Sequence, residues 1–172
     1  MHGRNSRSLT VEPLVQIGFE AFGDVIEMPR CGGRVINDGT ATRYDRVARL
    51  DLTANRGQPV LDMFHVKPVP LPAECKFLER HPISSQAFVP VGECRFIVLV
   101  APAMDDRPSA DAARVFITNG RQGVNYHPGV WHHPILALGM NTGFVMIGRA
   151  EDGCDCDVAP FAEGYTITIP QI

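Results

Sequence analysis

The chain has 172 residues, of which 45% are hydrophobic and 20% are charged, so it describes one folded domain of ordinary size and not a disordered chain. Its formal net charge of −3 gives no electrostatic reason to expect a nucleic-acid partner. The longest apolar run, residues 96–102, has the length of a strand and is far shorter than the roughly 18 residues of a membrane span, so we expect no membrane partner.

The N-terminal segment, residues 1–8, is polar, and no apolar stretch follows it as in a secretory signal peptide. We interpret residues 1–8 as a disordered tail and residues 9–172 as a single domain. Five cysteines at irregular spacing indicate free thiols and not a disulfide framework. Together these features predict a cytoplasmic protein.

Fourteen prolines and sixteen glycines divide the chain into short segments, which favours strands over long helices. One or two short helices are expected near the N-terminus, the clearest over residues 15–22. Strands are predicted over residues 24–28, 44–52, 60–66, 75–81, 86–91, 94–101, 114–118, 131–138, 144–149 and 165–169. So many short strands predict an all-β fold, either a barrel or a sandwich.

The segment 75–81 alternates in a way that places several reactive side chains together. Glu79 and His81 are two residues apart, so on a strand both point to the same face, while Arg80 points to the other. Gln86 on the next strand returns to the same layer, and His132 arrives from across the barrel. One carboxylate, two imidazoles and an amide oxygen are suitable ligands for a divalent transition metal.

These residues resemble the two motifs of the cupin superfamily. The first motif, with its His-x-His, Glu and Gly, reads here as Glu79-x-His81, Gln86 and Gly92. The second, Pro-x-Gly-x-x-His, reads as Pro128-Gly129 followed by His132, one residue shorter. Glu79 therefore replaces the first histidine of the family pattern, and Gln86 replaces its glutamate. The resemblance implies a cupin-like antiparallel β-barrel or jelly roll.

A closer resemblance is to the ureidoglycolate lyase family, and it covers about residues 9–160. It rests on these strings: AFGDVI at 21–26, LERHP at 78–82, QAFVP at 86–90, FITNG at 116–120, GVNYH at 123–127 and VWHHP at 130–134. Members of that family are cupin-fold homodimers of allantoin catabolism, with nickel as their cofactor. They split (S)-ureidoglycolate into glyoxylate and urea. The resemblance therefore implies a C–N lyase that binds this small molecule.

Elimination of urea requires that the substrate hydroxyl lose a proton, that the departing nitrogen gain one, and that the carboxylate be held. We assign the metal ligands to His81, His132, Glu79 and Gln86, and the proton transfers to His127, His133 and Tyr126. Substrate-binding candidates are the cations Arg80 and Lys67 and the hydrogen-bonding residues Ser84, Ser85 and Asn125.

Other interpretations of these residues and of the whole chain remain open. Glu79 and Arg80 also fit solvated surface charges, His133 fits a packed aromatic ring, and Trp131 is expected in the core. At the level of function, the alternatives are a cupin amidohydrolase that releases ammonia from ureidoglycolate, a sugar-acid isomerase, and a non-catalytic cupin that binds a small acid.

Overall fold

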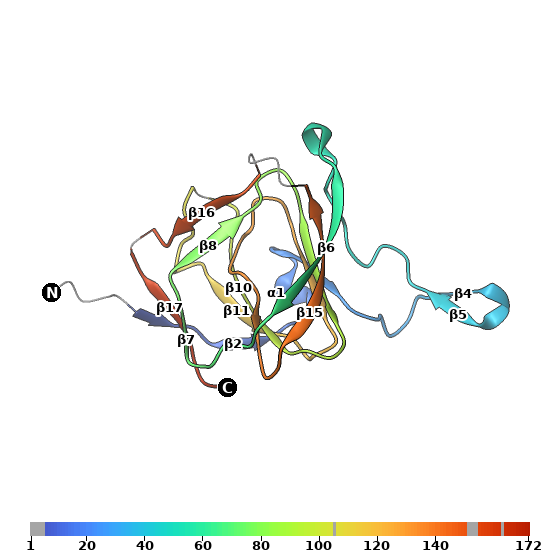
Figure 1. Ribbon diagram of the computed structural model, residues 1–172, viewed down its shortest axis with the longest axis horizontal. Coiled ribbons are helices and arrows are strands. Elements are labelled where there is room, and N and C mark those ends of the chain that lie inside the picture. The colour runs from blue at the N-terminus through green and yellow to red at the C-terminus, as the bar shows by residue number, and fades with distance from the viewer. Residues whose placement is uncertain (1–5, 105, 151–154, 163) are drawn as a thin grey trace.

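The computed structural model describes residues 6–104, 106–150, 155–162 and 164–172 (Figure 1). Three of its sheets pack on one another as layers, and a fourth, two-stranded sheet lies apart from them. The middle layer contains, in spatial order, β16 (Asp157–Pro160), β8 (Phe77–Arg80), β13 (Trp131–His132), β10 (Phe96–Ala101), β11 (Arg114–Ile117) and β2 (Val11–Pro13), with β14 (Leu136–Ala137) also paired to β10. One face of it packs on a five-stranded sheet of β3 (Gly23–Ile26), β12 (Gly123–Tyr126), β9 (Gln86–Val91), β15 (Thr142–Arg149) and β6 (Pro59–Val66). The other face is covered by β1 (Ser6–Ser8), β17 (Thr166–Ile169) and β7 (Ala73–Cys75).

Strand β10 separates two hydrophobic cores, because all six of its residues are buried. Phe96, Val98 and Val100 face the five-stranded sheet, where they pack with residues such as Phe88 and Phe144. The alternate residues Ile97, Leu99 and Ala101 face the small sheet. An apolar strand buried on both faces is what the sequence predicts for this segment.

The all-β, cupin-like fold class is confirmed. The strand pairings among the described residues are antiparallel except for β1 with β17 and β2 with β11, which are parallel. The helix predicted over 15–22 is a single turn, α1 (Gln16–Phe19), whose Phe19 is fully buried. No helix in the described part of the chain is long and apolar enough to cross a bilayer.

Four local expectations are corrected. Residues 44–52 form no strand, since they belong to an extended connection on the surface. The predicted strand 75–81 divides into β7 and β8, which belong to different sheets. The predicted strand 131–138 divides into β13 and β14 around Pro134, because proline donates no ladder hydrogen bond. Ser6–Ser8, expected in the tail, form β1, while residues 1–5 lie outside the described residues.

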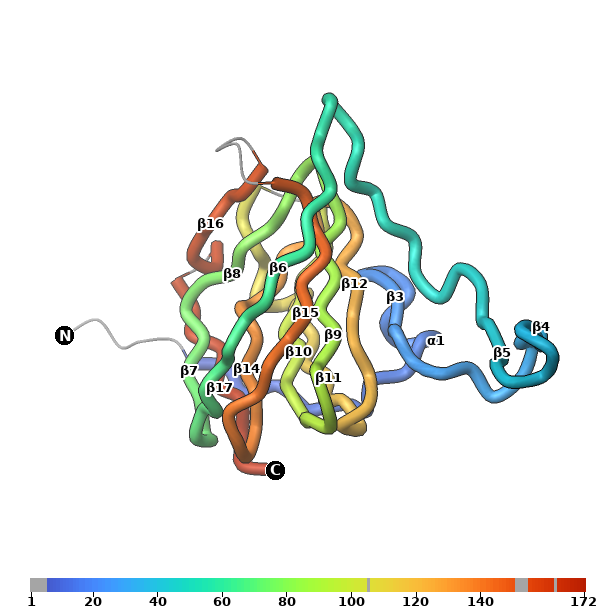
Figure 2. Tube along the Cα trace, turned by 45° about the vertical axis from the view of Figure 1, so that its right-hand side comes forward, coloured from blue at the N-terminus to red at the C-terminus, as the bar shows by residue number. Residues whose placement is uncertain are grey.

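A hairpin arm projects from the barrel (Figures 1 and 2). It consists of β4 (Arg34–Ile36), the turn η1 (Asn37–Gly39) and β5 (Ala41–Arg43). The turn places Asn37, Asp38 and Gly39 at positive φ, which these residue types tolerate best. A second turn, η2 (Ala54–Arg56), follows the arm and leads into β6.

Candidate metal centre and adjoining cavity

Glu79, His81 and His132 form a group that could hold a metal ion, since one ligand atom from each lies within 4.8 Å of the others. Glu79 lies on β8 directly opposite His132 of β13, and His81 follows the end of β8. The two-residue spacing of Glu79 and His81 therefore brings them to one face, as the sequence predicts. The Oε1 atom of Glu79 is 3.6 Å from Nε2 of His132.

Backbone carbonyls orient both imidazoles. Nδ1 of His81 lies 2.6 Å from the carbonyl oxygen of Asp155, and Nδ1 of His132 lies 2.9 Å from that of Val130. A carbonyl oxygen only accepts, so each ring donates from Nδ1 and keeps its lone pair on Nε2. Metal-binding histidines are held in this way by an acceptor behind the ring.

Among the described residues, neither Nε2 atom receives a hydrogen bond from a donor that suits its lone pair. Nε2 of His81 is buried with no hydrogen bond from any described residue. Nε2 of His132 lies 3.2 Å from Oε1 of Gln86, which places two acceptors together when both keep their lone pairs. A cation between these atoms would satisfy all of them, so the residues present fit a divalent metal.

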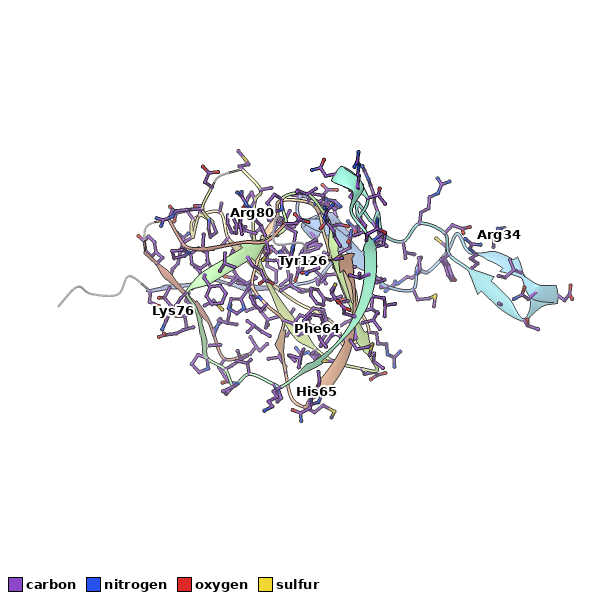
Figure 3. All side chains as sticks on the ribbon, turned by 45° about the horizontal axis from the view of Figure 1, so that its top comes forward. Arg34, Phe64, His65, Lys76, Arg80 and Tyr126 are labelled. Carbon is purple, nitrogen blue, oxygen red and sulfur yellow. The ribbon has the colours of Figure 1, made fainter. Side chains whose placement is uncertain are left out.

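Burial keeps the imidazole of His132 neutral. His132 is 1% exposed, and burial lowers its pKa to about 3, against the opposing effect of its hydrogen bond to Val130. The ring of Tyr126 stacks on that of His132 with centroids 4.1 Å apart and an interplanar angle of 9°. Burial, and then the charge of Glu79, raise the pKa of the Tyr126 hydroxyl above its ordinary value. Figure 3 shows Tyr126 in the middle of the barrel.

A cavity of about 300 Å³ adjoins these ligands. His81, Ser84, Ser85 and Gln86 line one side of it. The other side is formed by side chains from β6 and β15 and by the residue after β15: Val60, Asp62, Phe64, Met146, Gly148, Arg149 and Ala150. Because His81 belongs to both the cavity and the ligand group, and Gln86 of the cavity wall contacts His132, a small molecule in the cavity would reach the metal position.

The structure brings together Glu79, His81, Gln86, His132 and Tyr126, with Ser84 and Ser85 in the cavity wall. Ser84 Oγ donates to Asp155 Oδ2 at 2.6 Å, and the backbone N–H of Asp51 donates to Ser85 Oγ at 2.8 Å. Both serines therefore also hold the backbone that presents His81 and Gln86.

Two predicted substrate-binding residues have partners away from the cavity. Arg80 pairs with Asp157 at 2.9 Å. Its guanidinium lies over the ring of Trp131, which belongs to the core between the middle layer and the small sheet. Asn125 donates from Nδ2 to Asp24 and to the carbonyl of Arg49, and thereby attaches the base of the arm to the sheet. Both alternate away from the cavity along their strands.

Three further candidates are also absent from the cavity wall. His127 lies 3.5 Å from Asp24 on the outer side of β3. The ring of His133 packs on Phe77 with centroids 5.5 Å apart, which agrees with its reading as a packed aromatic. Lys67 follows the end of β6, past the part of that strand that lines the cavity.

Sequence reasoning missed Asp62, Arg149 and Asp155. The alternation of Val60, Asp62 and Phe64 could have indicated a polar residue on the inner face of β6. Asp155 accepts from the backbone N–H of Ile83 at 2.7 Å as well as from Ser84, so it fixes the loop that carries His81. No local pattern indicates that contact, since Asp155 lies 72 residues beyond Ile83.

Comparison with known proteins gives a consistent result over nearly the full length. Residues 6–168 match the family model described as ureidoglycolate lyase. The chain is 40% identical over 163 residues to the ureidoglycolate lyase of Pseudomonas syringae pv. syringae, covering 95% of each protein. It is 42% identical over 162 residues to that of Burkholderia mallei, covering 94% of each. A solved dTDP sugar isomerase from Desulfovibrio desulfuricans matches at 16% identity and TM-score 0.45 over 82% of this chain and 83% of its own, too distant a likeness to bear on the site.

Proposed function

Since this chain belongs to the ureidoglycolate lyase family, we propose that it eliminates urea from (S)-ureidoglycolate and releases glyoxylate, as a step of allantoin degradation. The observation that carries the proposal within the structure is the cavity whose wall shares His81 with the metal-ligand group and includes Gln86, which contacts His132. Its size suits a small substrate, and its mixed lining includes the cation Arg149 and the hydroxyls of Ser84 and Ser85, which suit an anionic one.

The proposed cofactor is a divalent metal, nickel by the family resemblance, held by His81, His132, Glu79 and Gln86. Such an ion would supply a Lewis acid that polarises the substrate hydroxyl and eases loss of its proton. The protein orients the two imidazoles through the carbonyls of Asp155 and Val130.

The remaining residues hold and orient the substrate. We propose that Ser84 and Ser85 shape the cavity next to the ligands, and that Tyr126, which stacks on His132 from outside the cavity lining, takes part in a proton transfer. His127, His133, Arg80, Asn125 and Lys67 stay predictions without a contact to the cavity.

The reaction type is tested by its products. Ureidoglycolate lyase activity releases urea with glyoxylate, whereas the alternative amidohydrolase releases ammonia from the same substrate. We expect urea in a one-to-one ratio with glyoxylate, measured with and without added urease. Ammonia formed without urease, and no urea, would overturn the assignment. Absence of any turnover would favour the non-catalytic acid-binding alternative.

The metal site is tested by His132→Ala, with His65→Ala as its control, because His65 lies on β6 and is exposed. His132→Ala should reduce both metal affinity and kcat/KM by about 100-fold or more. Loss of a residue that only hydrogen-bonds to a metal ligand already costs up to about 100-fold, and His132 is a proposed ligand itself. His65→Ala should change neither. Metal content is measured on purified protein, and full activity of chelated protein would refute a catalytic metal.

The proposed assembly is a homodimer, and the compartment is the cytoplasm. The homodimer rests on the family resemblance and on the outer face of the five-stranded sheet, where Leu61, Met63 and Val91 are exposed. Exposed Cys31 and buried Cys75 and Cys94 are free thiols, as is usual in a reducing compartment.

A further inference from the structure

Asp62 places a carboxylate on the side of the cavity that faces the metal ligands. Val60, Asp62 and Phe64 alternate along β6, and all three line the cavity. Asp62 is the one carboxylate among the described residues of that lining. Its side chain is exposed to solvent and forms no hydrogen bond or ion pair with another described residue. Its two oxygens are therefore available to a molecule in the cavity.

The strand register sets how far Asp62 lies from the ligand side. Asp62 pairs with Met146 of β15, which pairs with Phe88 of β9, and Gln86 is two residues before Phe88 on the same face. With strands about 4.8 Å apart, Asp62 lies roughly 10 Å across the sheet from the segment that carries Gln86.

Gly148 of β15 lines the cavity between these two sides, next to the side chain of Met146. This residue lies beside Gln86, and a Cβ built on it would come within 2.8 Å of Met146 Sδ and 3.8 Å of Gln86 Cγ. A side chain at position 148 would therefore intrude between the ligand side and β6.

The substrate has two chemically different ends that match the two sides. Its carboxylate and hydroxyl are ligands for a metal, which directs them to the side of His81 and Gln86. Its ureido group is planar and presents two parallel N–H donors, the same pattern by which a guanidinium pairs with a carboxylate. Directed away from the metal, that group meets the β6 side of the cavity.

The geometry points to Asp62 as the residue that recognises the ureido group through two N–H···O hydrogen bonds and so sets the specificity of the site. This inference rests on the proposed function, because it assumes that the hydroxy-acid end of the substrate lies at the metal. Asp62 is assigned a role in binding the departing urea and not as a metal ligand.

The test compares wild-type protein with Asp62→Asn, using two inhibitors. Glycolate has the carboxylate and hydroxyl without the ureido group, and ureidoacetate has the carboxylate and ureido group without the hydroxyl. Asp62→Asn replaces one acceptor by a donor, so Ki for ureidoacetate and KM for ureidoglycolate should each rise about tenfold or more, the usual worth of a hydrogen bond to a charged group. Ki for glycolate and the bound metal should stay unchanged.

Asp38→Asn is the control, because Asp38 lies at the tip of the arm and asparagine tolerates its positive φ of 52°. It should leave all four quantities at wild-type values. Equal weakening of both inhibitors, loss of metal or a lowered Tm in Asp62→Asn would overturn the specificity role, as would an unchanged Ki for ureidoacetate. If instead wild-type protein releases no urea from ureidoglycolate, the proposed function fails, which the product assay detects separately.

Discussion

At the scale of single residues, the site depends on which nitrogen of each histidine carries its proton. The carbonyl oxygens of Asp155 and Val130 accept hydrogen bonds from Nδ1 of His81 and His132. Both Nε2 atoms are therefore left for the metal position. The sequence predicts the shared face of Glu79 and His81 from strand alternation alone. It could not predict the carbonyl of Asp155, because that contact joins residues 74 positions apart.

Thiol reactivity is a residue-scale property that separates buried from exposed cysteines. Cys75 is 1% exposed, and burial raises the pKa of its thiol to about 12. A thiolate is the reactive form, so Cys75 should stay unmodified in native protein at mildly alkaline pH while exposed Cys31 is alkylated. Peptide mapping by mass spectrometry after brief iodoacetamide treatment measures both. Modification of Cys75 at the rate of Cys31 would contradict the packing described for it.

At the scale of elements, the one-turn helix α1 covers one end of the core that lies between the middle layer and the five-stranded sheet. The ring of Phe19 contacts those of Phe22, Phe116 and Tyr126, with centroids between 5.5 and 6.4 Å apart. A four-residue helix has little stability of its own, so this packing holds it in place. The sequence predicted the element from Phe19 and Phe22 but overestimated its length, because propensity does not show where tertiary contacts end.

Removing that ring should therefore be costly. Phe19→Ala should lower the free energy of unfolding by about 3–5 kcal/mol, the usual cost of a large buried aromatic. Ile17→Ala, on the same turn, removes a side chain that is 82% exposed and should change stability by less than about 0.5 kcal/mol. Urea denaturation of both variants measures the difference. Similar values for the two would show that α1 is not part of the core.

Strands β2 and β11 are also joined by an ion pair, which should make the free energy of unfolding depend on pH. Arg114 donates to both oxygens of Glu12, and these hydrogen bonds hold the pKa of Glu12 below its ordinary value of 4.5. A lowered folded-state pKa stabilises the protein above the ordinary value, and this contribution is lost as pH falls through the lowered one. Both side chains are over one-third exposed, so water screens the pair.

Glu12→Gln should consequently cost about 0.5 kcal/mol at neutral pH, within the range for surface pairs. Its difference from wild type should shrink toward zero in strong acid, where Glu12 is protonated in both states. Urea denaturation across that pH range measures the trend. A difference that grows on acidification would have the wrong sign for a carboxyl with a lowered pKa.

At the scale of the whole molecule, sheet order decides which edges remain for a partner. Strand β17 pairs with β1 on one side and β7 on the other, so it offers no edge, whereas β6 ends the five-stranded sheet. Long-range order of this kind could not be predicted from the sequence, and neither could β12, β16 or the projecting arm, since each depends on pairing between segments distant in the chain.

The dimer interface should accordingly lie on the outer face of the five-stranded sheet, next to β6. Met63 is 63% exposed there, and Met63→Glu should convert a dimer into a monomer of 18.9 kDa, because a buried unpaired charge is costly. Met140→Glu, at an exposed turn, should leave the dimer intact. Light scattering after gel filtration gives both masses. A wild-type monomer, or a Met63→Glu dimer, would place the interface elsewhere or remove it.

Because β10 supplies three side chains to each of the two cores, neither core can lose its packing while the other keeps all of its own. Partial unfolding of one layer would remove β10 from the other, so the layers should behave as a single cooperative unit. The amide protons of β10 should then exchange with solvent only when the whole chain opens, and a ligand bound in the cavity would slow them as much as it slows exchange in the small sheet on the far side.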